Sequence, residues 1–137
     1  MNIYEQLKLH EGVRLRPYKD SLGYLTIGVG RNLDANGISE EEAMILLVHD
    51  VQRVTEAVKR TFSWYMDLNE VRQKVIIDMV FNLGLIGFSK FTMTIKLLEI
   101  GNYKNAAENM LQSIWAHQVG KRARTLSKMM ETGEEQL

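Results

Sequence analysis

Residues 11–30 read EGVRLRPYKDSLGYLTIGVG, and the interpretation of the whole chain starts from this stretch. Glu11 closes an apolar-periodic segment, Asp20 follows nine residues later at a turn, and Thr26 lies on a short β-favouring run that two glycines close. Two carboxylates on different elements can face each other across a cleft, as glycoside hydrolysis requires, because one donates a proton while the other stays ionised. A single Glu and a single Asp are far more often solvated surface charges. Whether these two carboxylates are catalytic therefore depends on the surrounding sequence pattern.

A short helix that ends at Glu11 is predicted. Asn2 is a suitable N-cap, Glu5 stands three residues later and completes a capping box, and Gly12 can end the helix. This pattern places Glu11 at the C-terminal end of the helix.

Residues 16–33 change character. Pro17 blocks a helix, and the aromatic and β-branched residues of 24–27 favour strands. We therefore expect a small antiparallel sheet here, with Asn36-Gly37 turning the chain out of it.

Helical periodicity describes the remainder of the chain. Ser39 and Glu42 form a second capping box, which opens a helix from about 39 to 60, and a helix of that length spans roughly 30 Å. A strongly apolar helix follows from about residue 71 and ends at Gly84. The remaining expectations are helices at about 92–100, 103–115 and 120–131, core positions for Met129 and Met130, and a loose end over 132–137.

The predicted fold class is α+β, as a single domain over residues 1–137. Residues 13–38 form a small β lobe and residues 39–60 a connecting helix. Residues 61–137 together with 1–12 form a larger helical lobe.

Composition excludes several classes of function. Lys and Arg total 17, as do Asp and Glu, so net charge gives no argument for nucleic acid, and the basic cluster of 121–128 is short and lacks aromatic residues. No cysteine is present, and no G-x-S-x-G motif, so the usual amidase and peptidase nucleophiles are missing. His10, His49 and His117 lack metal-ligand spacing, and we expect no metal and no other cofactor. Residues 1–30 show no secretory signal, and no stretch has the length of a transmembrane helix.

The spacing of Glu11, Asp20 and Thr26, followed by Ile27-Gly28-Val29-Gly30, resembles the phage-type lysozymes, the family that contains the lysozymes of the T-even phages. The resemblance covers nearly the whole chain. Further matching motifs occur in the same order: Asn2-Ile3, Asp78 to Gly84, Gly87 to Thr92, Ala106-Ala107, Ser113 to Trp115, and Gln118 to Ala123.

This resemblance implies an endolysin-type muramidase that hydrolyses the β-1,4 bond between N-acetylmuramic acid and N-acetylglucosamine in bacterial peptidoglycan. Glu11 would protonate the leaving oxygen, Asp20 would act as base or charge stabiliser, and Thr26 would hold a water. It also implies a pair between Arg31 and Asp50, and an arginine, Arg122, that reaches towards Glu11. The substrate-binding residues implied are Asn32, Phe81, Asn82, Thr94, Asn109, Trp115 and Arg122.

The implied setting is lysis of a bacterial host from its cytoplasm, with peptidoglycan in the periplasm as substrate. A holin would open the route through the inner membrane, and a monomer without nucleic-acid or metal partners is expected. The segment between Gly30 and Ser39 is short compared with that of well-studied relatives, so the small lobe should be trimmed. Two alternatives stay open: a catalytically silent wall-binding module, and a transglycosylase that leaves an anhydro product. The sequence does not separate a free endolysin from a tail-lysozyme domain.

Overall fold

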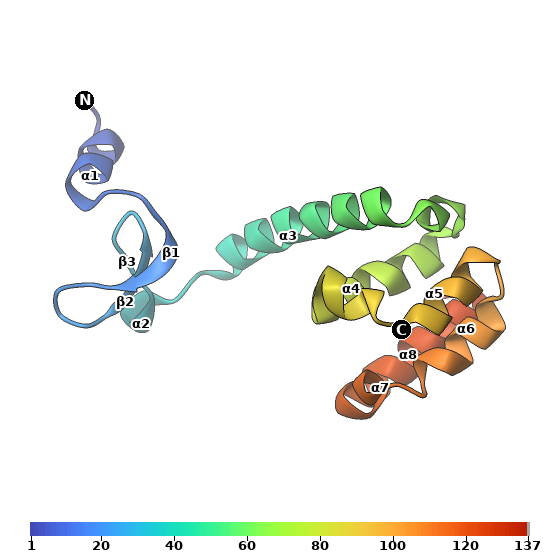
Figure 1. Ribbon diagram of the computed structural model, residues 1–137. Helices are drawn as coiled ribbons and strands as arrows, with labels where there is room; N and C mark the ends of the chain where they lie inside the picture. Colours follow the sequence, from blue (N-terminus) through green and yellow to red (C-terminus); the bar gives the residue numbers. More distant parts are fainter. Residues whose placement is uncertain (137) are drawn as a thin grey trace. The chain divides into compact units, whose positions relative to one another are not determined.

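The computed structural model describes residues 1–136. Two compact units, Met1–Leu46 and Leu47–Leu137, divide the chain within one long helix, and each unit is described by itself. The fold is helical with a small three-stranded antiparallel sheet, which confirms the predicted α+β class (Figure 1).

The first unit begins with α1 (Ile3–Glu11), whose boundaries match the prediction. The Asn2 side chain accepts a hydrogen bond from the Glu5 backbone N–H, the Glu5 side chain accepts one from the Asn2 backbone N–H, and Gly12 with φ 75° ends the helix. The capping box satisfies two backbone donors that a helix start otherwise leaves unpaired. Glu11 is therefore the last residue of this helix.

Three strands follow: β1 (Arg14–Lys19), β2 (Leu25–Gly28) and β3 (Arg31–Asn32), in the order β1-β2-β3. Both pairings are antiparallel, and the register sets Thr26 opposite Tyr18 on one side and Asn32 on the other. Pro17 lies in β1, an edge strand, where a missing N–H donor can be tolerated. The predicted sheet is confirmed, and it starts two residues earlier than expected.

A one-turn helix, α2 (Leu33–Asn36), was not predicted and follows β3 directly. The Asn32 side chain caps it by accepting from the Ala35 N–H at 2.9 Å, and Gly37 ends it. Periodicity cannot reveal so short a helix, because four residues complete only one turn.

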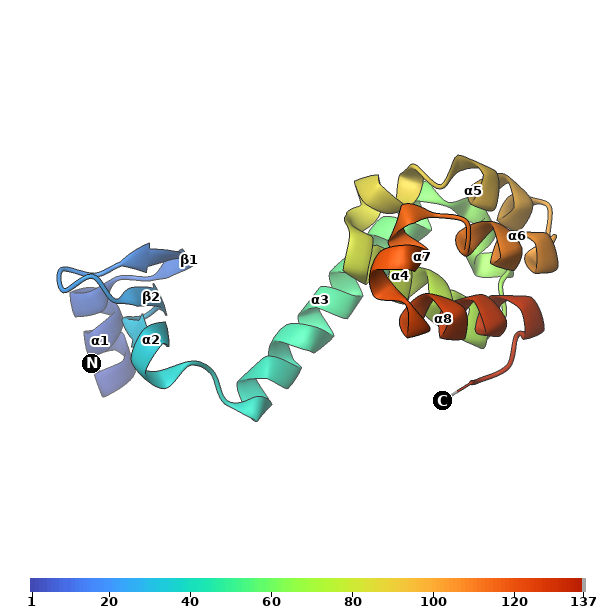
Figure 2. The same cartoon turned by 90° about the horizontal axis from the view of Figure 1, so that it is seen from below.

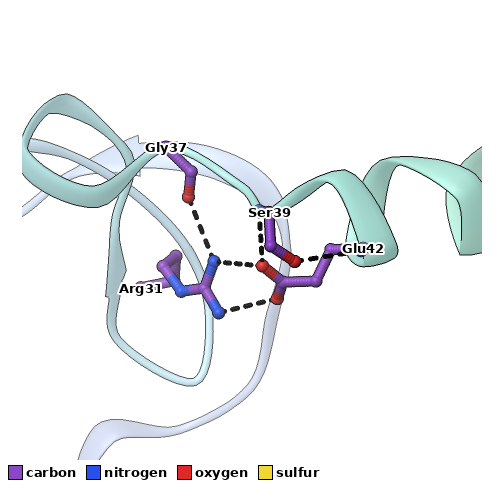
Figure 3. Close-up of polar contacts among 4 residues, drawn as sticks. All are labelled: Arg31, Gly37, Ser39 and Glu42. Carbon is purple, nitrogen blue, oxygen red and sulfur yellow. Dashed lines mark hydrogen bonds and ion pairs between the residues drawn. The ribbon is translucent and has the colours of Figure 1, made fainter.

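The long helix α3 (Glu40–Thr61) starts at the predicted capping box. Ser39 Oγ accepts from the Glu42 N–H at 3.1 Å, and Glu42 Oε1 accepts from the Ser39 N–H at 2.9 Å. The same Glu42 carboxylate receives both terminal nitrogens of Arg31, at 2.9 and 2.7 Å, and Arg31 also donates to the Gly37 carbonyl at 3.0 Å (Figure 3). Within the first unit, one carboxylate therefore ties β3 to the start of α3.

The second unit is helical throughout its regular elements. After α3 come the 3₁₀ turn η1 (Ser63–Asp67) and α4 (Glu70–Ser89). Gly84 has φ 77° and ψ 162°, which breaks α4 where the sequence predicted its end, although helical turns resume afterwards. The remaining helices are α5 (Thr92–Glu99), α6 (Tyr103–Met110), α7 (Ile114–Val119) and α8 (Lys121–Thr132).

The single helix predicted for residues 103–115 is wrong, because the chain breaks after Met110 and starts α7 at Ile114. Ser113 is extended, with φ −82° and ψ 158°, and its Oγ accepts from the Ala116 N–H at 3.1 Å. This N-cap starts α7 and lets Trp115 reach the core, where it is 4% exposed. The apolar Ile114-Trp115 pair continues the helical period in sequence, so the pattern hides the break.

The core of the second unit runs from Val58 to Met130 and includes Met129 and Met130 as predicted. Helix α6 packs against both α5 and α8, and α8 also contacts α4 and α7 (Figure 2). Phe88 is fully buried at the centre of an aromatic series, with ring centroids 5.6 Å from Phe62 and 6.1 Å from Phe91. In residues 1–46, by contrast, Thr26 is the one buried side chain.

The loose end expected over residues 132–137 is wrong for its first part, because 133–135 are tied to α4. The Asn69 side chain donates to the Gly133 carbonyl at 3.1 Å, and Lys74 forms an ion pair with Glu135 at 2.7 Å. Residue 137 lies outside the described residues.

None of the helices within residues 1–136 is by itself long and apolar enough to cross a membrane. Helices α4 and α5 pass the same criterion only as a pair, and they are bent by 104°.

Candidate active site

The three predicted catalytic residues, Glu11, Asp20 and Thr26, all belong to the first unit. Glu11 ends α1 with an exposed side chain, and its carboxyl group lies beside the backbone of Gly30 in the loop between β2 and β3. This position leaves the carboxyl group accessible to a ligand while its helix holds the backbone.

Asp20 stands in the turn between β1 and β2, and that turn binds its side chain. The Asp20 Oδ1 atom accepts from the N–H groups of Leu22 and Tyr24, both at 2.9 Å. The Asp20 N–H donates to the Tyr24 carbonyl at 2.9 Å, and the Gly23 N–H donates to the Asp20 carbonyl at 3.0 Å. Because one carboxylate oxygen is bound at two points, the orientation of the whole group is restricted.

Thr26 lies on β2 with only 3% of its surface exposed, and its Oγ1 donates to the Tyr24 carbonyl at 2.8 Å. The single hydroxyl proton is thus already used, so Oγ1 can act towards a ligand only as an acceptor. Asp20 and Thr26 are both bonded to the backbone of Tyr24, which fixes one relative to the other. The sequence did not predict this role of Tyr24, because its backbone groups, which any residue type could supply, make the bonds.

The predicted pair of Arg31 and Asp50 would join the two units, and each residue has a partner within its own unit. Arg31 binds Glu42, with the two side chains 38% and 40% exposed, and Asp50 is paired with Arg53 on its own helix. The pair between Arg31 and Asp50 stays a prediction. The Arg31 guanidinium holds the pKa of the Glu42 carboxyl at about 2, with a further contribution from the Ser39 N–H.

Asn32, the remaining predicted site residue of the first unit, pairs with Thr26 in the sheet and caps α2. Its side-chain oxygen therefore has a structural partner, and its substrate contact stays a prediction.

The other predicted substrate-binding residues belong to the second unit, where two pairs form. Trp115 Nε1 donates to Asn82 Oδ1 at 2.7 Å, which joins α7 to α4. Thr94 Oγ1 donates to Asn109 Oδ1 at 2.6 Å, which joins α5 to α6, and Thr94 is fully buried. Asn109 also lines a groove of about 370 Å³ with Lys90, Thr92, Gln112 and Ser113 among its other residues.

Phe81 and Arg122 come together on a further groove of about 410 Å³, in which Asp78 and Tyr65 also take part. Phe81 is 44% exposed, so it is a surface aromatic residue rather than a core one. Arg122 donates from Nε to Asp78 Oδ1 at 2.9 Å, and its Nη2 lies 2.7 Å from the same oxygen. Its predicted approach to Glu11 stays a prediction.

Comparison with known proteins matches residues 8–131 to the phage lysozyme family. The probable T4-type lysozyme 1 of Dictyostelium discoideum is 31% identical, over 96% of this chain and 95% of its own length. The endolysin of Salmonella phage P22 is 32% identical, over 77% of this chain and 76% of its own. The pre-baseplate central spike protein Gp5 of Enterobacteria phage T4 is 27% identical, over 97% of this chain and 28% of its own.

The alignment with the Dictyostelium protein spans 161 positions, whereas this chain has 137 residues, so that relative carries residues without a counterpart here. Their location in the segment after Gly30 stays a prediction. The match covers both the stretch with Glu11, Asp20 and Thr26 and the helices of the second unit. The chain therefore belongs to the phage lysozyme family, and it is a glycoside hydrolase that lyses bacterial peptidoglycan.

Proposed function

We propose that the chain hydrolyses the β-1,4 bond between N-acetylmuramic acid and N-acetylglucosamine, with Glu11 as proton donor and Asp20 and Thr26 as the pair that prepares water. The observation that supports this most is the arrangement at Tyr24. Its N–H binds the Asp20 carboxylate, and its carbonyl accepts the Thr26 hydroxyl proton. A rigid pair of acceptors is suited to orienting one water molecule.

The hydrogen bonds define what each group does. A water can donate one proton to Thr26 Oγ1 and the other to an Asp20 carboxylate oxygen, because both atoms can accept. Its lone pair is then available to attack the anomeric carbon, and Asp20 takes the proton that the water loses. Two N–H groups occupy Asp20 Oδ1, so Oδ2 is the oxygen that accepts from the water and takes its proton.

Glu11 has the complementary task of protonating the oxygen of the leaving sugar. Proton transfer of this kind contributes roughly a hundred- to ten-thousand-fold in rate, and positioning and charge stabilisation supply the rest. The attack by water on the face opposite Glu11 inverts the anomeric centre, so the first product of the β-linked substrate is the α-anomer.

The proposal is tested first by clearing of a peptidoglycan suspension. Wild-type protein should clear it, and Glu11→Gln should not, because an amide has no proton of the required acidity to donate. Equal clearing by Glu11→Gln would contradict the role of Glu11. A silent wall-binding module would instead bind the wall without clearing it in either form.

Product analysis separates hydrolysis from transglycosylation. Mass spectrometry should find reducing ends and no anhydro sugar, and NMR of a fresh digest should show the α-anomer first. A β-anomer, or a sugar trapped on Asp20, would contradict the role of Asp20 as base.

Substitution at Thr26 tests the water directly. Thr26→Val removes the acceptor oxygen and should abolish most of the activity, whereas Thr26→Ser keeps the hydroxyl and should retain much more. Asp20→Asn should also be severe but leave a trace. If Thr26→Val and Thr26→Ser were equally active, the hydroxyl would have no part in catalysis.

The proposed setting is lysis of a bacterial host, with synthesis in its cytoplasm, access to the periplasm through a holin, and action as a monomer without metal or nucleic acid. Endolysins among the similar proteins support the lytic role. We propose Asn32, Phe81, Asn82, Asn109, Trp115 and Arg122 as substrate contacts, and Thr94 as the residue that holds Asn109.

A further inference from the structure

Gly30 lies in the loop that joins β2 to β3. Ile27 pairs with Arg31, so residues 28–30, the first of which ends β2, connect the last paired residues of a β-hairpin. Loops of this length commonly place a residue with positive φ before the returning strand, and Gly30 has φ +66°. The conformation alone favours glycine.

A second constraint acts on Gly30 and comes from Glu11. A Cβ atom added to Gly30 would stand 2.8 Å from Glu11 Oε2 and 2.9 Å from Glu11 Cδ. Real Cβ atoms essentially never approach other heavy atoms this closely, so either the loop or the carboxyl group would have to move. The Glu11 carboxyl group therefore occupies the space that a side chain at position 30 would need.

Neighbouring glycines do not share this second constraint. Gly28, the last residue of β2, has φ +71° and nothing within 4 Å of an added Cβ. Gly12, which follows Glu11, has φ +75° and the same empty surroundings. Backbone strain on substitution is thus common to all three positions, and contact with Glu11 is specific to Gly30.

From this contact we propose that Gly30 is a positioning residue for Glu11. Because Gly30 has no side chain, the proton-donating carboxyl group can pack directly against its Cα atom. The proposal rests on the proposed role of Glu11 as acid. A glutamate side chain has several rotatable bonds and can place its carboxyl group in many positions when exposed. The backbone at Gly30 restricts these positions without adding a charge or a hydrogen-bonding side chain beside the acid.

The expected effect follows from how sensitive proton transfer is to distance. The methyl group that Gly30→Ala introduces would displace the carboxyl group by the order of 1 Å, and a misplacement of about 1 Å can cost roughly a hundred-fold in rate. Substrate affinity depends on many other contacts. Gly30→Ala should therefore lower kcat about a hundred-fold and leave KM within about three-fold of wild type.

Gly28→Ala is the matched control, because it imposes the same kind of backbone strain without the contact. Both variants should melt at a lower temperature than wild type. Measured below both melting temperatures, Gly28→Ala should keep kcat within a few-fold of wild type. Equal loss of kcat in the two variants would overturn the positioning role, since strain in the loop would then account for both.

A thermal unfolding cycle tests the contact without using activity. Glu11→Ala removes the Cγ, Cδ and Oε2 atoms that crowd the Gly30 position. Adding Gly30→Ala to Glu11→Ala should therefore lower Tm less than adding it to wild type, by a small difference because the exposed Glu11 carboxyl group can also move aside. Adding Gly28→Ala should lower Tm equally in both backgrounds. Additivity at Gly30 would overturn the proposal, and so would a double variant that fails to fold while Gly28→Ala folds.

The role of Glu11 as acid and the role of Gly30 in positioning it can be tested separately. If Glu11→Gln keeps full activity, the proposed acid is wrong, but the unfolding cycle still reports whether Gly30 and Glu11 touch. If Glu11→Gln is inactive while the cycle is additive, the acid stands and the positioning role of Gly30 falls.

Discussion

Thr94 is fully buried, although its sequence position suggested a contact with sugar. Its hydroxyl is bonded to Asn109 Oδ1 at 2.6 Å, and Asn109 lines a groove on the surface of the second unit. A polar side chain inside a helical core needs such a partner, because an unpaired buried polar group costs about 1–3 kcal/mol. Any effect of Thr94 on substrate would thus pass through the orientation of the Asn109 amide.

Thr94→Val should lower the free energy of unfolding by about 1–3 kcal/mol, because Asn109 Oδ1 loses its donor while the shape is nearly conserved. Thr94→Ser keeps the donor and should lose less. Urea unfolding of the three proteins measures both effects. A Thr94→Val variant as stable as wild type would show that the buried bond contributes nothing.

At the scale of elements, Glu42 serves two structures at once, the start of α3 and the ion pair with Arg31 (Figure 3). The Arg31 guanidinium and the Ser39 N–H lower the pKa of the Glu42 carboxyl from 4.5 to about 2. Arginine stays charged throughout the relevant pH range, so only the carboxyl group titrates. The contribution is modest, because both side chains are well exposed.

A lowered pKa in the folded state means that the pair stabilises the fold above the unfolded-state pKa of about 4.5. That stability should be lost as pH falls from there towards about 2. Between about pH 5 and pH 2, the denaturant midpoint of wild type should therefore fall more than that of Glu42→Gln. Parallel curves for the two proteins would contradict a folded-state role for the ionised carboxyl group. Added salt should reduce the difference.

Helix α8 depends on α4 for its C-terminal end. Arg72 donates to the carbonyls of Met130 and Glu131 at 2.7 and 2.9 Å, and its guanidinium lies 4.2 Å from the Tyr103 ring centroid. The last carbonyls of a helix have no partner within it, so an arginine from another helix can satisfy them.

Arg72→Ala should lower the free energy of unfolding by about 1–3 kcal/mol through the loss of these bonds and of ring contact. Arg72→Lys should recover only part, because a single ammonium lacks the planar fork. Arg124→Ala, at an exposed position on α8, is the control and should stay within about 0.5 kcal/mol of wild type. Equal losses of unfolding free energy in the Arg72 and Arg124 variants would contradict the role of Arg72 at the C-terminal end of α8.

At the scale of the whole molecule, the buried hydrophobic residues among those that the structure describes all belong to the second unit. All buried apolar residues among 1–136 lie between Val58 and Met130, whereas residues 1–46 keep apolar side chains such as Leu15 exposed. The first unit is therefore organised by caps, turns and the Arg31–Glu42 pair, and the second mainly by burial of apolar surface.

Substitutions in the two units should differ accordingly. Phe88→Ala, at a fully buried position, should cost about 3–5 kcal/mol of unfolding free energy. Leu15→Ala, at a position 85% exposed, should cost less than about 0.5 kcal/mol. Comparable losses in denaturant unfolding would contradict the difference in burial between Phe88 and Leu15.

Local signals in the sequence determined much of this protein. The caps at Asn2 and Ser39, the stop at Gly12 and the break at Gly84 all act within a turn or two of helix, and the structure has each of them. The family was also evident from residue spacing, because spacing along the chain survives where overall similarity is low. The sequence did not predict α2 or the break after Met110, because each involves too few residues to leave a periodic signal.

Only the tertiary structure decided which groups meet. It paired Arg31 with Glu42 and Arg122 with Asp78, joined Asp20 to Thr26 through the backbone of Tyr24, and set the bare Cα of Gly30 against Glu11. An ion pair forms with whichever opposite charge the fold brings within a few ångströms, and a backbone contact leaves no mark on residue type. Which groups form these contacts depends on distances in the folded structure, and neither residue spacing along the chain nor composition gives those distances.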